Sequence, residues 1–79
     1  MTREEVFEVL TEIFEDTFDE EDLELTDATC ADDIEAWDSL EHINLIFAIE
    51  QHYHIKFAMD EVNSFKNVGQ LVDAVLAKA

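Results

Sequence analysis

Apolar residues recur at helical spacing from the start of the chain, and acidic residues fill the positions between them. At about 100° per residue the apolar side chains share one side of a helix: Val6, Phe7, Leu10, Ile13, Phe14 and Phe18. The opposite side carries Glu4, Glu5, Glu8, Glu12 and Glu15. Thr2 and Glu5 have the spacing of a capping box, which marks a helix start. The pattern predicts a core helix with an acidic outer side.

The helical pattern stops between residues 19 and 37. This stretch is rich in Asp and Glu, and its few large apolar residues are Leu23, Leu25, Ile34 and Trp37. Loops of such length inside a small domain are uncommon and are often functional. We expect a long, partly ordered loop that lays these side chains over the core.

A second helix is predicted over about residues 39–51. Asp38 and Glu41 repeat the cap spacing, and most of the positions that follow are apolar. The helical projection groups Leu45, Ile46 and Ile49 on one side. Leu40 and Phe47 fall elsewhere, between Glu50 on one flank and Asn44 and Gln51 on the other. We therefore expect Leu40 and Phe47 to face the solvent.

The last third of the chain predicts an extended segment and two more helices. Residues 52–57 alternate apolar and polar positions, but a lone strand would have no partner, so we expect an extended loop. Met59, Val62 and Phe65 suggest a short helix around residues 60–63. Asn67 and Gln70 form a third cap-like pair, and the stripe behind them predicts a final helix that ends near Lys78: Val68, Leu71, Val72, Val75 and Leu76. The predicted fold is all-α, a small bundle of three main helices plus one short helix, with a long loop after the first, in a single domain over residues 1–79.

The charge balance limits the kinds of partner that the protein can bind. Four Lys and Arg stand against 21 Asp and Glu, a net charge of −17. A chain without a basic patch does not bind nucleic acid in the ordinary way, so its partners should be basic proteins. With 48% hydrophobic residues and no Pro the chain should nevertheless fold.

Cysteine content and hydropathy bear on location. A single cysteine excludes an intramolecular disulfide and a Cys-based zinc site. The chain begins with an acidic amphipathic pattern and has no run of about 20 apolar residues. We expect a cytoplasmic monomer without membrane insertion.

Ser39 is the first candidate for chemistry, because it follows the long loop and opens the most apolar helix. Asp38 or Ser39 can be a helix cap and nothing more. A functional alternative adds a phosphate, since free amides and the dipole at a helix N-terminus stabilise an anion.

The segment Asp38-Ser39-Leu40 and the helix behind it resemble the 4'-phosphopantetheine attachment region of acyl carrier proteins. The resemblance extends over essentially the whole chain. It implies a non-catalytic carrier whose Ser39 receives the arm from coenzyme A and Mg²⁺ through a phosphopantetheinyl transferase, and whose arm holds acyl groups as thioesters. It also implies that Asp38 and Leu40 assist docking of that transferase. Acyl-loading and acyl-processing enzymes with basic patches would then recognise Glu41, Asn44, Phe47 and Glu50.

Some positions depart from the usual fatty-acid type. Asn44 and Gln51 stand where acids are common, Trp37 replaces a small residue, and Phe47 replaces what is often Met. This form looks more like carriers of polyketide, polysaccharide-modifying or other specialised pathways. We expect an acyl chain to find shelter among the apolar residues of the bundle: Leu45, Ile46, Ile49, Ile55, Met59 and Val62.

Two other functions remain open at this point. An unmodified acidic adaptor needs only the net charge and an exposed Leu40 and Phe47, and it predicts a salt-sensitive complex with a basic partner that does not depend on Ser39. An aminoacyl or peptidyl carrier keeps the same arm and the same serine.

The remaining reactive side chains have modest interpretations. His42 lies one helical turn after Ser39, but a hydrolase also needs an orienting group and an oxyanion hole, so we take His42 as a half-buried spacer, with contact to the arm as the alternative. The pair His52 and His54, and the acidic run over residues 22–33, lack the geometry of a metal site. Cys30, among acidic neighbours, is expected to be structural or incidental.

Overall fold

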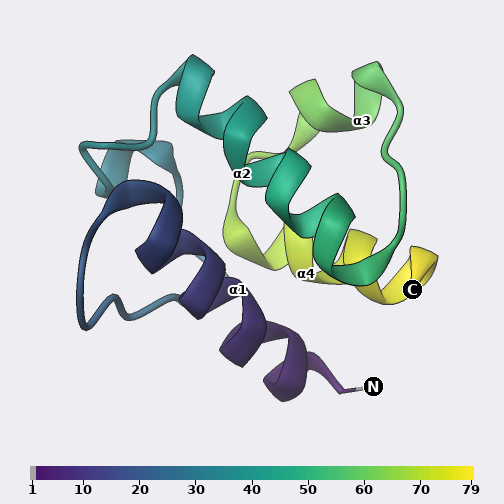
Figure 1. Ribbon diagram of the computed structural model, residues 1–79, viewed down its shortest axis with the longest axis horizontal. Helices are drawn as coiled ribbons and strands as arrows, with labels where there is room; N and C mark the ends of the chain where they lie inside the picture. The colour runs from purple at the N-terminus through teal and green to yellow at the C-terminus, as the bar shows by residue number, and fades with distance from the viewer. Residues whose placement is uncertain (1) are drawn as a thin grey trace.

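The computed structural model describes residues 2–79 and contains four α-helices and one short 3₁₀ turn. The elements are α1 (Arg3–Phe18), η1 (Ala31–Asp33), α2 (Ser39–Tyr53), α3 (Met59–Ser64) and α4 (Val68–Lys78). Within the described range there is no strand, so the predicted all-α bundle is confirmed. Helix α1 runs antiparallel to α2 and contacts both α2 and α4, and the short α3 lies beside α2 on the side away from α1 (Figure 1).

The three main helices begin where the cap spacing predicts. Each cap side chain accepts a hydrogen bond from the amide three residues later: Thr2 from Glu5 at 3.2 Å, Asp38 from Glu41 at 2.8 Å, and Asn67 from Gln70 at 2.9 Å. The Thr2 amide also donates to the Glu5 carboxylate at 3.1 Å, which completes the predicted capping box.

Two helices extend beyond their predicted bounds. Helix α2 continues through Tyr53 instead of residue 51, and it ends where His54 adopts a left-handed conformation with φ of 56° and donates its amide to the Glu50 carbonyl. Helix α3 is one residue longer at each end than the predicted residues 60–63. It starts early because the Glu61 carboxylate accepts a hydrogen bond from the Ala58 amide at 3.0 Å. This bond caps the helix start, since Ala58 has no polar side chain to do so.

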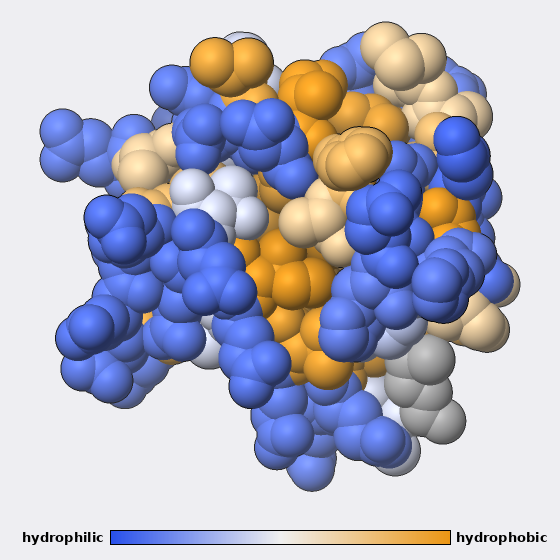
Figure 2. All heavy atoms as spheres, viewed as in Figure 1, coloured by the Kyte–Doolittle hydropathy of each residue, from blue (hydrophilic) through white to orange (hydrophobic). Residues whose placement is uncertain are grey.

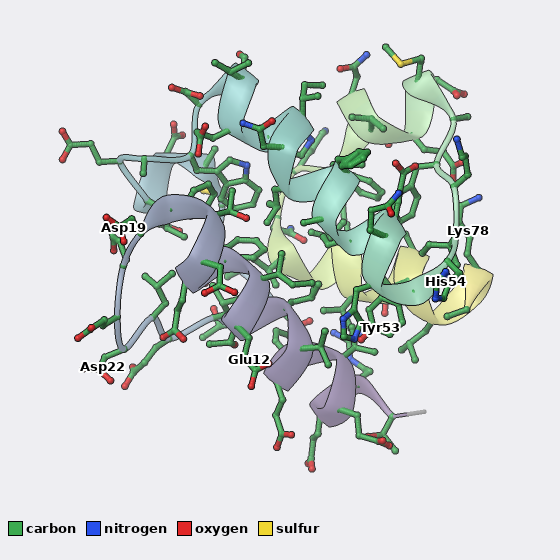
Figure 3. The ribbon with its side chains drawn as sticks, in the orientation of Figure 1. Glu12, Asp19, Asp22, Tyr53, His54 and Lys78 are labelled. Atoms are coloured by element: carbon green, nitrogen blue, oxygen red, sulfur yellow. The ribbon has the colours of Figure 1, made fainter. Side chains whose placement is uncertain are left out.

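One apolar core joins the main helices. Its fully buried side chains come from one stripe of each helix: Val6, Leu10 and Phe14 from α1, Leu45 and Ile49 from α2, and Val68, Leu71, Val72 and Val75 from α4. Phe7 and Ile13, predicted on the inner side of α1, pack against the margin of this core and are only partly buried. The charged back of α1 stays outside, as the labelled Glu12 shows (Figure 3).

The long loop is tied to the bundle at several points. Arg3 pairs with both Asp27 and Asp73, and the amides of Val68 and Gly69 donate to the Thr29 and Asp27 carbonyls at 2.8 and 3.1 Å. As predicted, Ile34 and Trp37 are buried, and Leu23 and Leu25 are partly buried against the core. The 3₁₀ turn η1 was not predicted. Asp19 and Asp22, labelled in Figure 3, lie at the start of the loop. Both have positive φ, which Asp tolerates better than most residues.

None of the helices described over residues 2–79 combines the length and the apolar content needed to cross a membrane.

Candidate functional site

Ser39 is the first residue of α2, and its side chain is exposed. The Asp38 carboxylate caps the helix by accepting the Glu41 amide, and the His42 amide makes the first helical bond to the Asp38 carbonyl at 2.9 Å. The amides of Ser39 and Leu40 come before that bond and have no carbonyl partner inside the helix. An exposed hydroxyl therefore stands beside the positive end of a helix.

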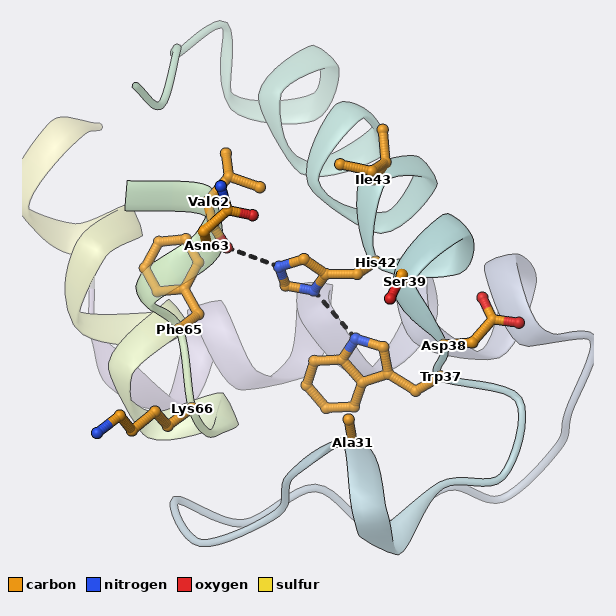
Figure 4. Close-up of a pocket in the computed structure, with 10 residues that line it drawn as sticks. All are labelled: Ala31, Trp37, Asp38, Ser39, His42, Ile43, Val62, Asn63, Phe65 and Lys66. Carbon is orange, nitrogen blue, oxygen red and sulfur yellow. Dashed lines mark hydrogen bonds between the residues drawn. The ribbon is translucent and has the colours of Figure 1, made fainter. Parts of the chain in front are cut away.

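A hollow of about 530 Å³ opens next to Ser39. It lies between the end of the long loop, the start of α2 and the end of α3 (Figure 4). Its wall includes the rings of Trp37, His42 and Phe65, the side chain of Val62, and Lys66 at the rim. Ser39 lies at a helix start, as predicted, but the hollow was not predicted, because two of its walls come from α3 and the loop.

A hydrogen-bonded chain crosses the back of this hollow. The Trp37 Nε1–H group donates to His42 Nδ1 at 3.0 Å, and His42 Nε2 lies 2.8 Å from the Val62 carbonyl oxygen (Figure 4). The spacer interpretation of His42 is therefore too weak, since the ring makes specific contacts on both sides. The only sequence signal was a ring with two polar nitrogens five residues after an indole N–H donor.

These two hydrogen bonds of His42 also argue against a hydrolase. Both ring nitrogens of His42 are engaged by groups other than Ser39, so the ring is not placed to take the Ser39 proton. Over residues 2–79 no group of three or more His, Cys, Asp or Glu side chains is arranged to hold a metal ion.

Four large apolar side chains remain exposed on α2 and α3. They are Leu40, Ile43, Phe47 and Met59, with exposed fractions of 69%, 48%, 57% and 73%. We call these four residues the apolar stripe. Apolar side chains interrupt the hydrophilic surface over this part of the molecule in Figure 2. The predicted exposure of Leu40 and Phe47 is confirmed. Ile43 and Met59 are also exposed, which was not predicted.

A second hollow, of about 180 Å³, lies between α2 and α3 under part of the apolar stripe. It brings together three residues of the predicted acyl shelter, Ile46, Met59 and Val62. Leu45 and Ile49 are instead fully buried in the core, and Ile55 does not line this hollow. The sequence pattern could not separate the residues that fill the core from those that border a space.

The residues predicted for partner recognition take different places. Phe47 and Asn44 are exposed, and the Asn44 side-chain amide donates to the partly buried Glu41 carboxylate at 3.1 Å. Glu50 is half-buried, and its carboxylate accepts the Phe57 amide at 2.8 Å. One oxygen of the Glu50 carboxylate is therefore bonded to the loop after α2.

Comparison with known proteins supplies the family. The model of the phosphopantetheine attachment site family matches residues 8–75. The acyl carrier protein of Petrotoga mobilis is 35% identical over 79 residues, which is 99% of this chain and 92% of that protein. The solution structure of the holo acyl carrier protein from Geobacter metallireducens superposes with a TM-score of 0.86 at 51% identity, and covers 91% of this chain and 83% of that chain. The chain therefore belongs to the acyl carrier proteins of the phosphopantetheine attachment site family, which carry acyl groups and do not catalyse their conversion.

Proposed function

We propose that Ser39 carries the 4'-phosphopantetheine arm, and that acyl intermediates travel on its thiol as thioesters. One observation carries this assignment: Ser39 is an exposed hydroxyl at the start of α2, at the edge of the larger hollow. The family match over residues 8–75 spans this position.

The surroundings of Ser39 fit a phosphodiester. The unpaired amides at the start of α2 and the helix dipole favour a negative group there. The Asp38 and Glu41 carboxylates oppose it, but Asp38 is exposed and Glu41 is only partly buried, so water and salt screen this repulsion. The hollow beside Ser39 has room for part of an extended arm.

The neighbours of Ser39 have separate roles in attachment. The Ser39 hydroxyl gives its proton to a base of the transferase, and its oxygen bonds to the phosphorus on the pantetheine side of coenzyme A. The pyrophosphate P–O bond breaks, and adenosine 3',5'-bisphosphate leaves. Asp38 holds the first turn of α2 in shape through the Glu41 amide and offers a carboxylate to the transferase and its Mg²⁺. Leu40, 69% exposed, provides an apolar contact for that enzyme.

The partners proposed are the phosphopantetheinyl transferase and acyl-loading and acyl-processing enzymes with basic docking patches. Such patches complement a molecule with a net charge of −17, and electrostatic attraction speeds encounter without tight binding. We assign the apolar contact to Phe47 and the polar contacts to Glu41, Asn44 and Glu50. The carrier acts as a monomer in this proposal, and nucleic acid is not a partner.

The cargo is proposed to be a fatty-acid, polyketide or related acyl intermediate. Family membership favours this over an unmodified acidic adaptor. Asn44, Gln51 and Trp37 favour a specialised pathway over general fatty-acid synthesis.

Intact-mass measurement tests the assignment. After incubation with coenzyme A, Mg²⁺ and a broad-specificity transferase, the protein should gain one phosphopantetheine, and Ser39→Ala should gain none while remaining folded. Ser64→Ala is the matched control, because it removes another exposed serine hydroxyl, at the end of α3, and should load normally. Loading of Ser39→Ala, or no loading of the folded wild type by several transferases, would refute the assignment.

A further inference from the structure

The hydrogen bonds of His42 define which ring nitrogen carries the proton. The Trp37 indole can only donate, so His42 Nδ1 must accept at 3.0 Å. A neutral ring then carries its single N–H on Nε2, and this group donates to the Val62 carbonyl at 2.8 Å. The Trp37 donor and the Val62 acceptor thus favour the same tautomer, in which His42 holds α3.

The Trp37 side chain is held in place by its burial and its packing. It is 7% exposed and packs edge-on against Phe14, with ring centroids 5.1 Å apart and an interplanar angle of 83°. The His42 ring lies nearly parallel to the indole, at 6.0 Å and 24°. The orientation of His42 is therefore anchored in the core through α1.

Helix α3 has few other attachments. Val62 is its only buried residue, and Glu61 links it to Lys78 of α4 by an ion pair at 3.1 Å. Lys66, whose amide would close a helical bond to the Val62 carbonyl, donates to the Gln70 side chain instead at 2.9 Å. His42 takes the place of that missing donor at the end of the helix.

We propose that His42 is a positioning residue, which fixes α3 as the wall of the hollow beside Ser39 through the chain from Trp37 to the Val62 carbonyl. Val62 lines both hollows, so the position of α3 sets their size together. The consequence for the arm and its cargo rests on the proposed attachment at Ser39: releasing α3 exposes the thiol end of the arm to water.

The first experiment uses the unloaded protein. In alkaline buffer, ¹⁵N NMR of the His42 ring should show Nδ1 without a proton and Nε2 with one. Trp37→Phe removes the donor and keeps a buried aromatic ring. The Val62 carbonyl can only accept, so the variant should keep its proton on Nε2, while the Nδ1 resonance should shift because Nδ1 has lost its donor. A proton on Nδ1 in the wild type would overturn the proposal, and this reading does not require any variant to fold.

Hydrogen exchange then tests the link to α3. Loss of one hydrogen bond of ordinary strength should speed exchange of the α3 amides about five-fold in His42→Ala, with α1 and α4 unchanged. His42→Gln keeps one acceptor and one donor in a side chain and should restore slow exchange. His52→Ala, an exposed histidine on the same helix, is the matched control. Unchanged exchange in His42→Ala, or equally fast exchange in His42→Gln, would refute the role.

The last experiment uses the loaded protein. Alkylation of the arm thiol by iodoacetamide should be about five-fold faster in loaded His42→Ala than in the loaded wild type, in proportion to the opening of α3, and close to the wild-type rate in His42→Gln. Equal rates in all three proteins would overturn the shelter assigned to α3. If the wild type does not load at all, the proposed attachment at Ser39 is contradicted. The NMR and hydrogen-exchange results then still test the positioning role of His42.

Discussion

Gly69 is where the long loop comes nearest to the start of α4. Its amide donates to the Asp27 carbonyl at 3.1 Å. A Cβ atom at this position would lie 2.6 Å from Asp27 Oδ1 and 3.0 Å from the Asp27 carbonyl oxygen. The Asp27 carboxylate can turn toward the solvent, but the Asp27 carbonyl oxygen and Cβ atom, which would lie 3.0 and 3.1 Å away, move only with the backbone. The absence of a side chain at Gly69 thus lets the loop pack on the helix.

We expect Gly69→Ala to destabilise the protein by up to about 2 kcal/mol. Overpacking costs about 1–3 kcal/mol, and alanine regains at most about 1 kcal/mol of helix propensity. Urea unfolding followed by circular dichroism measures the balance. Ala77→Gly, at an exposed position of the same helix, gives the propensity difference without any clash. A Gly69→Ala variant more stable than the wild type would contradict this account.

At the residue scale, local signals predicted part of the site. Ser39 and Phe47 are exposed as expected, because helical periodicity and a cap decide both. The hydrogen bonds of Glu50 and His42 were not predicted. Their contacts with the Phe57 amide and the Val62 carbonyl depend on how distant segments approach α2, and a single sequence does not report that approach.

At the scale of elements, the three long helices were predictable because each has its own cap and its own apolar stripe. The end of α2 was not, since His54 takes the left-handed conformation there without the usual glycine. Helix α3, unlike the three long helices, has no cap side chain at its N-cap residue. With six residues it is too short to be stable alone, and it depends on Glu61, which binds the Ala58 amide and Lys78.

These contacts make α3 sensitive to acid. The Ala58 amide, followed by Lys78, holds the pKa of Glu61 below its ordinary value of 4.5. A carboxyl group with a lowered folded-state pKa stabilises the fold above its unfolded pKa, and this contribution is lost as the pH falls through the folded value. We therefore expect the free-energy advantage of the wild type over Glu61→Gln to be full near neutral pH and to shrink below about pH 4.5.

Urea unfolding at a series of pH values measures this advantage. Asp60→Asn is the control, because it removes the same charge one position away and leaves the Ala58 and Lys78 contacts of Glu61 in place. A difference between wild type and Glu61→Gln that grows on acidification would show that the carboxylate does not support α3.

At the scale of the whole molecule, charge opposes folding. A net charge of −17 is confined to a body of 27 × 25 × 21 Å. In the described part of the chain, Arg3 and Lys78 form ion pairs with Asp27, Asp73 and Glu61, which leaves most carboxylates uncompensated. The Debye length falls from about 30 Å at 0.01 M to about 10 Å at 0.1 M salt, so added salt screens repulsion across the body.

We expect the melting temperature to rise with NaCl and more steeply with Mg²⁺. A gain of about 1 kcal/mol corresponds to roughly 4–8 °C for a domain of this size. Differential scanning calorimetry over a salt series measures it. Replacing Glu8 and Glu12 on the exposed back of α1 by Gln should raise stability at low salt and reduce the salt gain. A melting temperature independent of both salts would contradict the repulsion argument.

The apolar stripe has a consequence that depends on this same charge. An exposed row of Leu40, Ile43, Phe47 and Met59 would ordinarily invite self-association. Two copies of this molecule repel each other before their stripes can touch, whereas a basic protein is drawn in. Charge thus acts as a barrier against aggregation that only an oppositely charged surface lowers, and the stripe can stay permanently uncovered without a lid.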